Sequence, residues 1–396
     1  MIEIEQVWKA VDRRTVALSA ERIPLDQAGD RMLAVAVRAD TDLPPFDQSA
    51  MDGYALGSAP SGAPFKQVAT LAAGHASRRT LRPGEAARVF TGARLPRGTF
   101  AIARQEDCTA KADVVRVGVA CPHGAHVRQR GGIARAGAQI LPAGCRLLPG
   151  VAGLLASCNA FEVSVLRRPK IEHLVTGDEL ARPGEKLRPG RIRDANGPLI
   201  QALLAALGLS TRRRRLSDSA AALRKAVVKS DADLLLISGG SGPGGRDHAR
   251  AALEAAGFAV HCSSVNSRPG RPLIFASRGP RLAFGLPGNP LSHYVTFHGF
   301  VRRAIARMEG RPPPRLLSAT LRGDPPDADD RRRSWFPARL TLGAGGAEAR
   351  PLRWKHSGDL TPLAEANALI LSSGEAPLRD GDRVAVLPAF DTLEAA

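Results

Sequence analysis

The spacing of apolar residues divides the chain into stretches of different character. Residues 4–11 place apolar side chains with the period of an amphipathic helix, and an apolar run at 32–37 has the composition of a strand. From about 45 to 140, short β-prone runs alternate with glycine and proline turns, which predicts a small β-rich domain. A helix and a strand are expected again within 141–170.

The following stretch, 171–310, has the pattern of a parallel sheet covered by helices. Continuous apolar runs at 171–175, 234–238 and 282–285 alternate with helical patterns, as expected of strands that are buried on both faces. One of the helices is predicted to begin with Asn289 as its cap and a proline in its first turn.

Strand-like runs separated by turns resume after a proline-rich break, so residues 315–396 are expected to form a small β-barrel. We predict an α/β multidomain protein, because a chain of 396 residues exceeds the about 250–300 residues at which one hydrophobic core stops growing. The predicted domains are a discontinuous N-terminal domain (1–45 with 141–170), a β-rich inserted domain (46–140), a domain with a central parallel sheet (171–310) and the C-terminal barrel (315–396).

Composition excludes two classes of protein and suggests a compartment. Apolar residues make up 44% of the chain and charged residues 24%, as in folded globular proteins, and no apolar run reaches the roughly 20 residues of a membrane-spanning helix. The first residues lack the basic and apolar regions of a signal peptide, and the five cysteines are scattered. We therefore expect a cytoplasmic protein that is neither disordered nor embedded in a membrane.

The formal net charge of +18 comes from arginine, since the chain has only eight lysines. Guanidinium groups suit phosphate and other oxyanions, so anionic partners are favoured. The arginine runs 212–215 and 331–333 are short and have no aromatic residue directly beside them for base stacking, so no nucleic-acid partner is expected. A codon bias in a GC-rich genome would explain the arginine excess equally well.

Three loops follow the apolar runs of the predicted sheet. They are Thr176-Gly177-Asp178-Glu179-Leu180, the glycine-rich segment 239–245 with Arg246-Asp247-His248, and Gly285-Leu286-Pro287-Gly288-Asn289-Pro290. Ligands of open α/β sheets bind at the carboxyl ends of the strands, so the three loops together predict a ligand site. The glycine-rich segment suits a phosphate, which its backbone N–H groups can approach closely, but a tight turn without a ligand fits it equally well.

Two further segments carry candidate chemistry. The polar stretch 44–55 contains two aspartates and suits a metal or ligand site, or an Asp-Gly turn between two domains. The turn Arg268-Pro269-Gly270-Arg271-Pro272 presents two guanidinium groups, which suit an oxyanion, although a solvated basic loop has the same pattern. The stretch 121–126 resembles half of a metal site but lacks a second Cys or His cluster at zinc spacing, so we expect a loop there.

The identities and order of these segments resemble the molybdopterin molybdotransferases, the molybdenum insertases related to the E domain of gephyrin. The resemblance extends from about residue 3 to about residue 390 and rests on six motifs. They are Pro44-Pro45-Phe46-Asp47-Gln48-Ser49-Ala50-Met51-Asp52-Gly53-Tyr54-Ala55, Thr91-Gly92-Ala93, Thr176-Gly177-Asp178-Glu179-Leu180, Asp194-Ala195-Asn196, the loop 239–247 and Gly285-Leu286-Pro287-Gly288-Asn289-Pro290.

The resemblance implies a homodimer, in which the molybdopterin-binding domain 171–310 is completed by the β-rich insert of the other subunit. It implies that adenylylated molybdopterin and molybdate bind, that the metal passes to the pterin dithiolene, and that AMP is released with the help of Mg²⁺. Transient contacts with a molybdopterin adenylyltransferase and with molybdoenzyme chaperones are implied as well.

Carried over residue by residue, the resemblance assigns roles to fourteen positions. The catalytic residues it implies are Asp52, Glu179, Asp218 and Asp247, of which Glu179 and Asp247 hold the metal. The substrate-binding residues it implies are Ser49, Thr91, Thr176, Gly239, Gly240, Gly244, Arg268, Arg271, Pro287 and Asn289.

The chain departs from the family pattern at several positions. Arg268 and Arg271 replace two lysines, which exchanges compact ammonium groups for wider planar forks at an oxyanion site. Ser241-Gly242-Pro243 replaces Val-Ser-Val, and 98–100 and 131–133 lack the acidic residues usual there. These departures leave open a non-catalytic or specialised paralogue that binds and delivers molybdopterin or the finished cofactor. A tungsten-handling variant also stays open, and the charge alone would fit a basic scaffold or nucleic-acid-binding protein.

Overall fold

The structure is a computed structural model that describes residues 1–58, 62–75, 77–239, 248–325, 333–374 and 376–390. The chain divides into two compact units, one of residues 21–165 and one of residues 1–20 together with 166–396. No helix within the described residues is both long and apolar enough to cross a membrane.

A six-stranded mixed sheet forms the centre of the unit that contains residues 166–396. Its strands follow the order β16 (Thr211–Leu216), β13 (Ile171–Thr176), β17 (Leu234–Ser238), β20 (Arg281–Leu286), β19 (Ile274–Arg278) and β18 (Ala259–Cys262). The first four strands are parallel, as the apolar runs predicted, whereas β19 and β18 continue the sheet in antiparallel pairing. The parallel strands therefore bring their carboxyl ends to one edge of the sheet.

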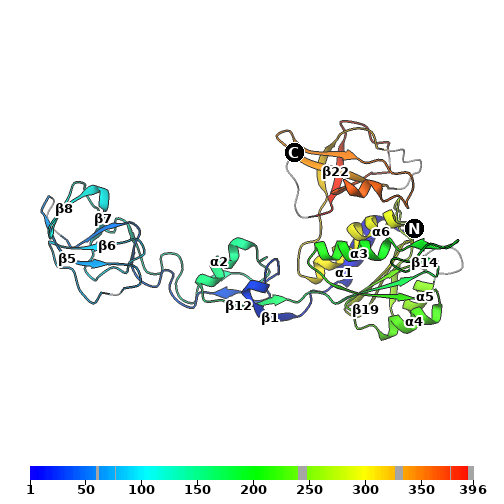
Figure 1. Cartoon of the computed structure of the whole chain (residues 1–396), viewed down its shortest axis with the longest axis horizontal. Coiled ribbons are helices and arrows are strands. Elements are labelled where there is room, and N and C mark those ends of the chain that lie inside the picture. The colour runs from blue at the N-terminus through cyan, green and yellow to red at the C-terminus, as the bar shows by residue number, and fades with distance from the viewer. Residues whose placement is uncertain (59–61, 76, 240–247, 326–332, 375, 391–396) are drawn as a thin grey trace. The chain divides into compact units, whose positions relative to one another are not determined.

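Helices cover both faces of this sheet, because side chains alternate between its two faces along each strand. Leu234 and Leu236 pack in one apolar cluster, and Leu235 and Ile237 pack in another. The first cluster contains side chains of α1 (Ile4–Arg14), α3 (Asn196–Ala206) and α6 (Pro290–Thr296), and the second contains those of α4 (Ala220–Lys229) and α5 (His248–Ala255) (Figure 1).

The helix that begins after Asn289 is interrupted by one π-helical turn. α6 passes into the π-helical segment η3 (Phe297–Val301) and then into α7 (Arg302–Met308). Within η3 the carbonyl oxygen of Gly299 accepts a hydrogen bond of 2.7 Å from the indole of Trp8 in α1. This bond ties the N-terminal helix to the interrupted helix.

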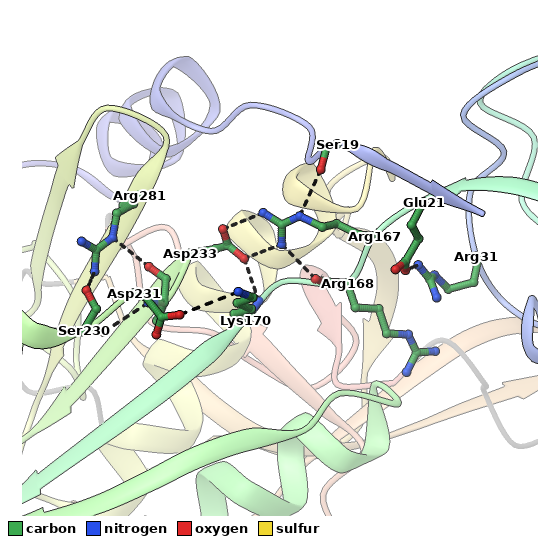
Figure 2. A network of polar contacts seen from close by, with 11 residues as sticks. Ser19, Glu21, Arg31, Arg167, Arg168, Lys170, Ser230, Asp231, Asp233 and Arg281 are labelled. Carbon is green, nitrogen blue, oxygen red and sulfur yellow. Dashed lines mark hydrogen bonds and ion pairs between the residues drawn. The ribbon is translucent and has the colours of Figure 1, made fainter. Parts of the chain in front are cut away.

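The segment that enters the sheet at β13 is fixed by an ionic network at the amino end of the strands. Figure 2 shows that Arg167 donates to both carboxylate oxygens of Asp233, at 2.6 and 2.8 Å, and to the hydroxyl of Ser19 at 3.2 Å. The backbone N–H of Lys170 also donates to Asp233, at 2.8 Å. Arg167 thus links the chain segments that lead out of this unit and back into it.

The C-terminal part of the same unit is a closed five-stranded barrel, as predicted. Its strands follow the order β21 (Leu317–Leu321), β23 (Gly346–Pro351), β22 (Trp335–Gly343), β24 (Ala368–Leu371) and β25 (Arg383–Pro388), and a short 3-10 helix, η4 (Thr361–Ala364), precedes β24. Trp335 of the barrel is fully buried in the apolar cluster that also contains α6 and η3. The short pair β14 (Leu180–Ala181) and β15 (Ile192–Arg193) lies beside the central sheet.

The unit 21–165 is rich in β-structure. Its main sheet follows the order β7 (Ala101–Arg104), β4 (Gly53–Leu56), β6 (Glu85–Val89), β5 (Phe65–Leu71), β9 (Val114–Val117) and β8 (Cys108–Lys111). Three two-stranded pairs are β1 (Ala20–Pro24) with β12 (Glu162–Leu166), β2 (Val37–Arg38) with β11 (Gln139–Leu141), and β3 (Gln48–Ser49) with β10 (Val127–Arg128). The helices are η1 (Leu25–Gln27), η2 (Gln105–Asp107) and α2 (Pro149–Ser157).

The predicted fold class is confirmed, but one predicted strand is wrong. The apolar run at 32–37 forms only isolated bridges, from Met32 to Arg146 and from Leu33 to Val165, before β2 begins at Val37. The finer division of the N-terminal half into a discontinuous domain and an inserted domain stays a prediction.

Candidate functional site

Two of the predicted loops meet closely at the carboxyl edge of the parallel strands. Thr176, the buried last residue of β13, donates from its hydroxyl to the carbonyl oxygen of Ser238 at 3.4 Å. Gly239 follows Ser238 with a φ of 94°, and a Cβ there would lie 2.5 Å from the Thr176 hydroxyl. Only glycine fits this approach, so the first residue of the glycine-rich segment packs directly on β13. The predicted site residues Gly240, Gly244 and Asp247 lie outside the described residues.

An acidic corner lies at the end of β13. The carboxylate of Glu179 folds back over Gly177, where a Cβ would lie 2.8 Å from both carboxylate oxygens. The backbone N–H of Asp218 donates to the carboxylate of Asp178 at 3.3 Å, so Asp218 lies at the same corner. Within the described residues, no group of three or more His, Cys, Asp or Glu side chains has the geometry of a metal site. The predicted metal pair includes Asp247, so its geometry lies beyond those residues.

A cavity of about 930 Å³ lies next to this corner, and most of its charged lining residues are arginines. We call it the arginine cavity. Its charged residues are Arg182, Arg191, Arg193, Arg213, Arg215, Asp178 and Asp194. Arg213 forms an ion pair with Asp194, whereas Arg191 and Arg215 donate to the backbone carbonyls of Asp178 and Leu180. Five cations and two carboxylates leave a surplus of three positive charges, which attracts anions.

The arginine run on β16 is therefore divided between different partners. Arg213 and Arg215 line the arginine cavity, while Arg214 pairs with the buried carboxylate of Glu172 at 2.9 Å. Because side chains alternate along a strand, neighbouring arginines lie on opposite faces of β16. From the sequence alone the run is only a cluster of positive charge. The alternation of its side chains across the strand explains why part of the run lines a cavity.

The predicted basic turn lines a second cavity of about 540 Å³, between the central sheet and the barrel. We call it the barrel cavity, and its polar residues are Ser267, Arg268, Arg271, Asn289, Ser292, Ser334, Lys355, His356 and Ser357. Asn289 donates from its side chain to the hydroxyl of Ser357 at 2.6 Å, and Leu291 donates from its backbone to the Ser357 carbonyl at 3.0 Å. Arg268, Arg271 and Asn289 thus share one cavity.

The barrel contributes residues to this cavity that the sequence analysis missed. Lys355, His356 and Ser357 follow β23 in a segment without regular structure, and no motif identified them. They approach the basic turn because the chain near the start of β22 pairs with it. The backbone N–H of Trp335 donates to the Arg268 carbonyl at 2.7 Å, and that of Arg268 to the Arg333 carbonyl at 2.9 Å. Pro287 is buried in the loop before Asn289.

The remaining predicted residues lie in the unit 21–165. One carboxylate oxygen of Asp52 accepts hydrogen bonds from the backbone N–H of Thr91 at 2.7 Å and from its hydroxyl at 2.8 Å. These bonds, the backbone bond first, hold the pKa of Asp52 below its usual range. Ser49 is fully buried and its hydroxyl donates to the Met51 carbonyl at 2.5 Å, so this hydroxyl fixes the loop that carries Asp52.

Comparisons with known proteins identify the family along the whole chain. Residues 2–159 match the family model of the MoeA N-terminal region (domain I and II), residues 172–307 match that of a probable molybdopterin binding domain, and residues 323–389 match that of the MoeA C-terminal region (domain IV).

Curated relatives and a solved structure agree with these matches. A molybdopterin molybdenumtransferase of Nostoc sp. is 33% identical over 96% of this chain and 91% of its own length, and one of Staphylococcus epidermidis is 29% identical over 94% and 92%. The crystal structure of a molybdopterin biosynthesis MoeA protein from Pyrococcus horikoshii superposes with a TM-score of 0.83 at 26% identity, covering 98% of this chain and 99% of that one. The chain belongs to the MoeA family.

Proposed function

We propose that this chain is a molybdopterin molybdenumtransferase that binds adenylylated molybdopterin and molybdate and releases AMP. The observation that carries the proposal is the similarity to curated molybdopterin molybdenumtransferases over nearly the full length of both chains. In the exchange, the two dithiolene thiols each form a Mo–S bond, and their two protons leave with one oxo group of molybdate as a water molecule. A water molecule adds across the phosphoanhydride bond, and AMP departs.

The two cavities support this assignment, since both reactants are anions. Molybdate is a compact dianion, and Arg268, Arg271 and Lys355 surround a cavity of suitable chemistry. The phosphates of the pterin adenylate are best suited to the arginine cavity and to the glycine-rich segment beginning at Gly239. Thr176 fixes the start of that segment, and Asn289 lines the cavity proposed for molybdate.

We propose Mg²⁺ as the divalent cation that assists the reaction. Mg²⁺ prefers carboxylate and phosphate oxygens, and Glu179 and Asp247 are the carboxylates that would hold it beside the substrate phosphates. The cation would neutralise charge that develops on the departing phosphate. Asp218 would then orient water or the cation's own ligands from its place near Asp178.

Asp52, Thr91 and Ser49 enter the proposal through a homodimer. In that arrangement the unit 21–165 of one subunit serves the ligand site of the other, so that Asp52 adds a further carboxylate. Thr91 keeps this carboxylate ionised and oriented, and Ser49 fixes the loop from within.

The experiment that tests the function is genetic. The chain is expressed in a bacterial strain that lacks its own molybdenum insertase, and nitrate reductase activity reports the finished cofactor. We expect the wild-type chain to restore activity and E179Q to restore none at equal protein level. Failure of the wild-type chain, with substrate still bound by the purified protein, would favour the carrier paralogue instead.

A further inference from the structure

A chain of buried hydrogen bonds lies beneath the loops of the candidate site. His173 lies in β13, Ser238 ends β17, and His293 lies in α6. The Nε2 atom of His173 is 2.6 Å from the Ser238 hydroxyl oxygen, and the Nε2 atom of His293 is 2.7 Å from the same oxygen. Both imidazoles are fully buried and Ser238 is 2% exposed, so solvent does not share these bonds.

The protonation of this cluster follows from counting donors. Burial lowers the pKa of both histidines to about 3, so each ring is neutral at pH 7 and carries one N–H. The serine hydroxyl has a single proton, so it donates to one imidazole and accepts from the other. One histidine is therefore the Nε2–H tautomer and the other the Nδ1–H tautomer.

The cluster is a costly way to stabilise a core. Neither the Nδ1 atom of His173 nor that of His293 has a hydrogen-bond partner among the described residues. A buried polar group without a partner is destabilising, and apolar side chains of similar volume would avoid that cost. The cluster is thus better explained by what it holds in place than by the stability that it adds.

What the cluster holds in place is the junction of Gly239 with the loops at 177–180 and 285–290. His173 lies three residues before Thr176, Ser238 directly precedes Gly239, and His293 lies in the first turn of α6 after Asn289. The strands β13 and β17 are paired neighbours, whereas α6 belongs to the layer that covers one face of the sheet. The two hydrogen bonds therefore join the middle of β13 and the end of β17 to the helix that follows residues 285–290.

We propose that Ser238 is a positioning residue, whose hydroxyl uses His173 and His293 to keep Gly239 and the loops at 177–180 and 285–290 in a single arrangement. The ordering of the loops is independent of the proposed function. Only the identity of the anionic substrate that the ordered loops receive rests on that function.

The test compares two serines of the same sheet. Ser277 in β19 is also buried, and its hydroxyl lies 2.8 Å from Nε2 of His261 in β18. S238A and S277A each remove a serine hydroxyl from a histidine, but S277A does so at the antiparallel edge. Amide hydrogen exchange is followed in peptides that cover 177–180 and 287–289, in the full-length protein without ligand.

We expect exchange in both peptides to accelerate at least about tenfold in S238A and to stay within about twofold of wild type in S277A. S238T, which keeps the hydroxyl, restores slow exchange. If S238A does not fold, S238C gives the same comparison, since a thiol fills the space but bonds weakly. Unchanged exchange in S238A or S238C, or equal acceleration in S277A, would overturn the proposal.

Substrate kinetics separate this proposal from the proposed function. In S238A the KM for adenylylated molybdopterin should rise at least about tenfold, with a smaller change in kcat, while S277A keeps the wild-type KM. If the wild-type chain releases no AMP, the proposed function fails, and the exchange experiment still decides the role of Ser238. If wild type is active and S238A keeps both its KM and its slow exchange, Ser238 has no positioning role.

Discussion

Asp52 and Thr91 are 39 residues apart in the chain, yet a single carboxylate oxygen of Asp52 accepts both hydrogen bonds that Thr91 can donate. The backbone bond comes from the turn after β6, and the hydroxyl bond comes from the same residue's side chain. Together they keep the carboxylate ionised and limit its rotation. The carboxylate is thus held in a fixed orientation, as a group that acts on a substrate phosphate or cation requires.

The first prediction concerns this pair. T91V removes the hydroxyl bond and keeps the backbone bond, so the pKa of Asp52 should rise and molybdate-stimulated AMP release should fall about tenfold. D52N should lower the rate by about 100-fold or more. T99V is the control. It removes the hydrogen bond from the Thr99 hydroxyl to the Pro96 carbonyl in the same unit and should keep wild-type activity. A D52N protein of normal activity would place Asp52 outside the site.

The second prediction concerns the basic turn in the barrel cavity. The double variant R268K/R271K exchanges two planar forks for two compact charges, so the molybdate concentration that gives half-maximal AMP release should shift by about tenfold. The affinity for adenylylated molybdopterin should change less. R278K, in β19 outside the cavity, serves as the control. If neither constant changes in R268K/R271K, the turn lies outside the site.

The third prediction tests the arginine cavity. R215Q removes one of five cavity cations and should weaken binding of adenylylated molybdopterin by about tenfold at low salt, with a smaller loss as KCl screens the remaining charge. R212Q, on the same strand but not lining the cavity, should bind as wild type does. Isothermal titration at 50 and 300 mM KCl measures both. Equal affinities of R215Q and R212Q would show that the substrate does not use this cavity.

The fourth prediction concerns acid stability. Among the described residues neither ring nitrogen of His298 has a hydrogen-bond partner, and burial lowers its pKa to about 3. Between about pH 6.5 and 3 the unfolded chain binds a proton there that the folded chain does not, so the free energy of unfolding falls as the pH falls. One such histidine lowers the free energy of unfolding by up to about 1.4 kcal/mol for each unit by which the pH falls.

His298 contacts the rings of Tyr294, Phe297 and Phe390, which suits a phenylalanine replacement. The Tm of H298F, measured by calorimetry, should therefore fall less than that of wild type between pH 7 and pH 4.5. H75F, at an exposed position, should follow the wild-type curve. Parallel curves for H298F and wild type would show that His298 does not contribute to the acid loss.

The spacing of apolar residues predicted those helices and strands whose own apolar pattern is regular. The helix at 4–14 and the buried strands were identified because one amphipathic face or a continuous apolar run suffices to specify them. The strand predicted at 32–37 is wrong because this run pairs with Arg146 and Val165 only through single bridges. The antiparallel strands β18 and β19 were not foreseen, because short apolar runs do not encode strand direction.

The sequence pointed to candidate site residues where they lie at the end of a strand, as Thr176 does, or directly after it, as Gly239 does. Lys355 and His356 were missed because they reach Arg268 only through pairing between the barrel and the sheet, which no local pattern records. His173 and Ser238 lie within apolar runs and were treated as strand positions. A histidine inside a fully buried strand was the available signal, because most buried polar side chains form a hydrogen bond.

The proposed molybdenumtransferase activity is measured as AMP release from adenylylated molybdopterin by the purified protein, with Mg²⁺ and in the presence and absence of molybdate. We expect molybdate to stimulate the release of AMP and molybdenum to be bound to the pterin product. Tight binding of adenylylated molybdopterin without AMP release under either condition would contradict it and would make the chain a carrier.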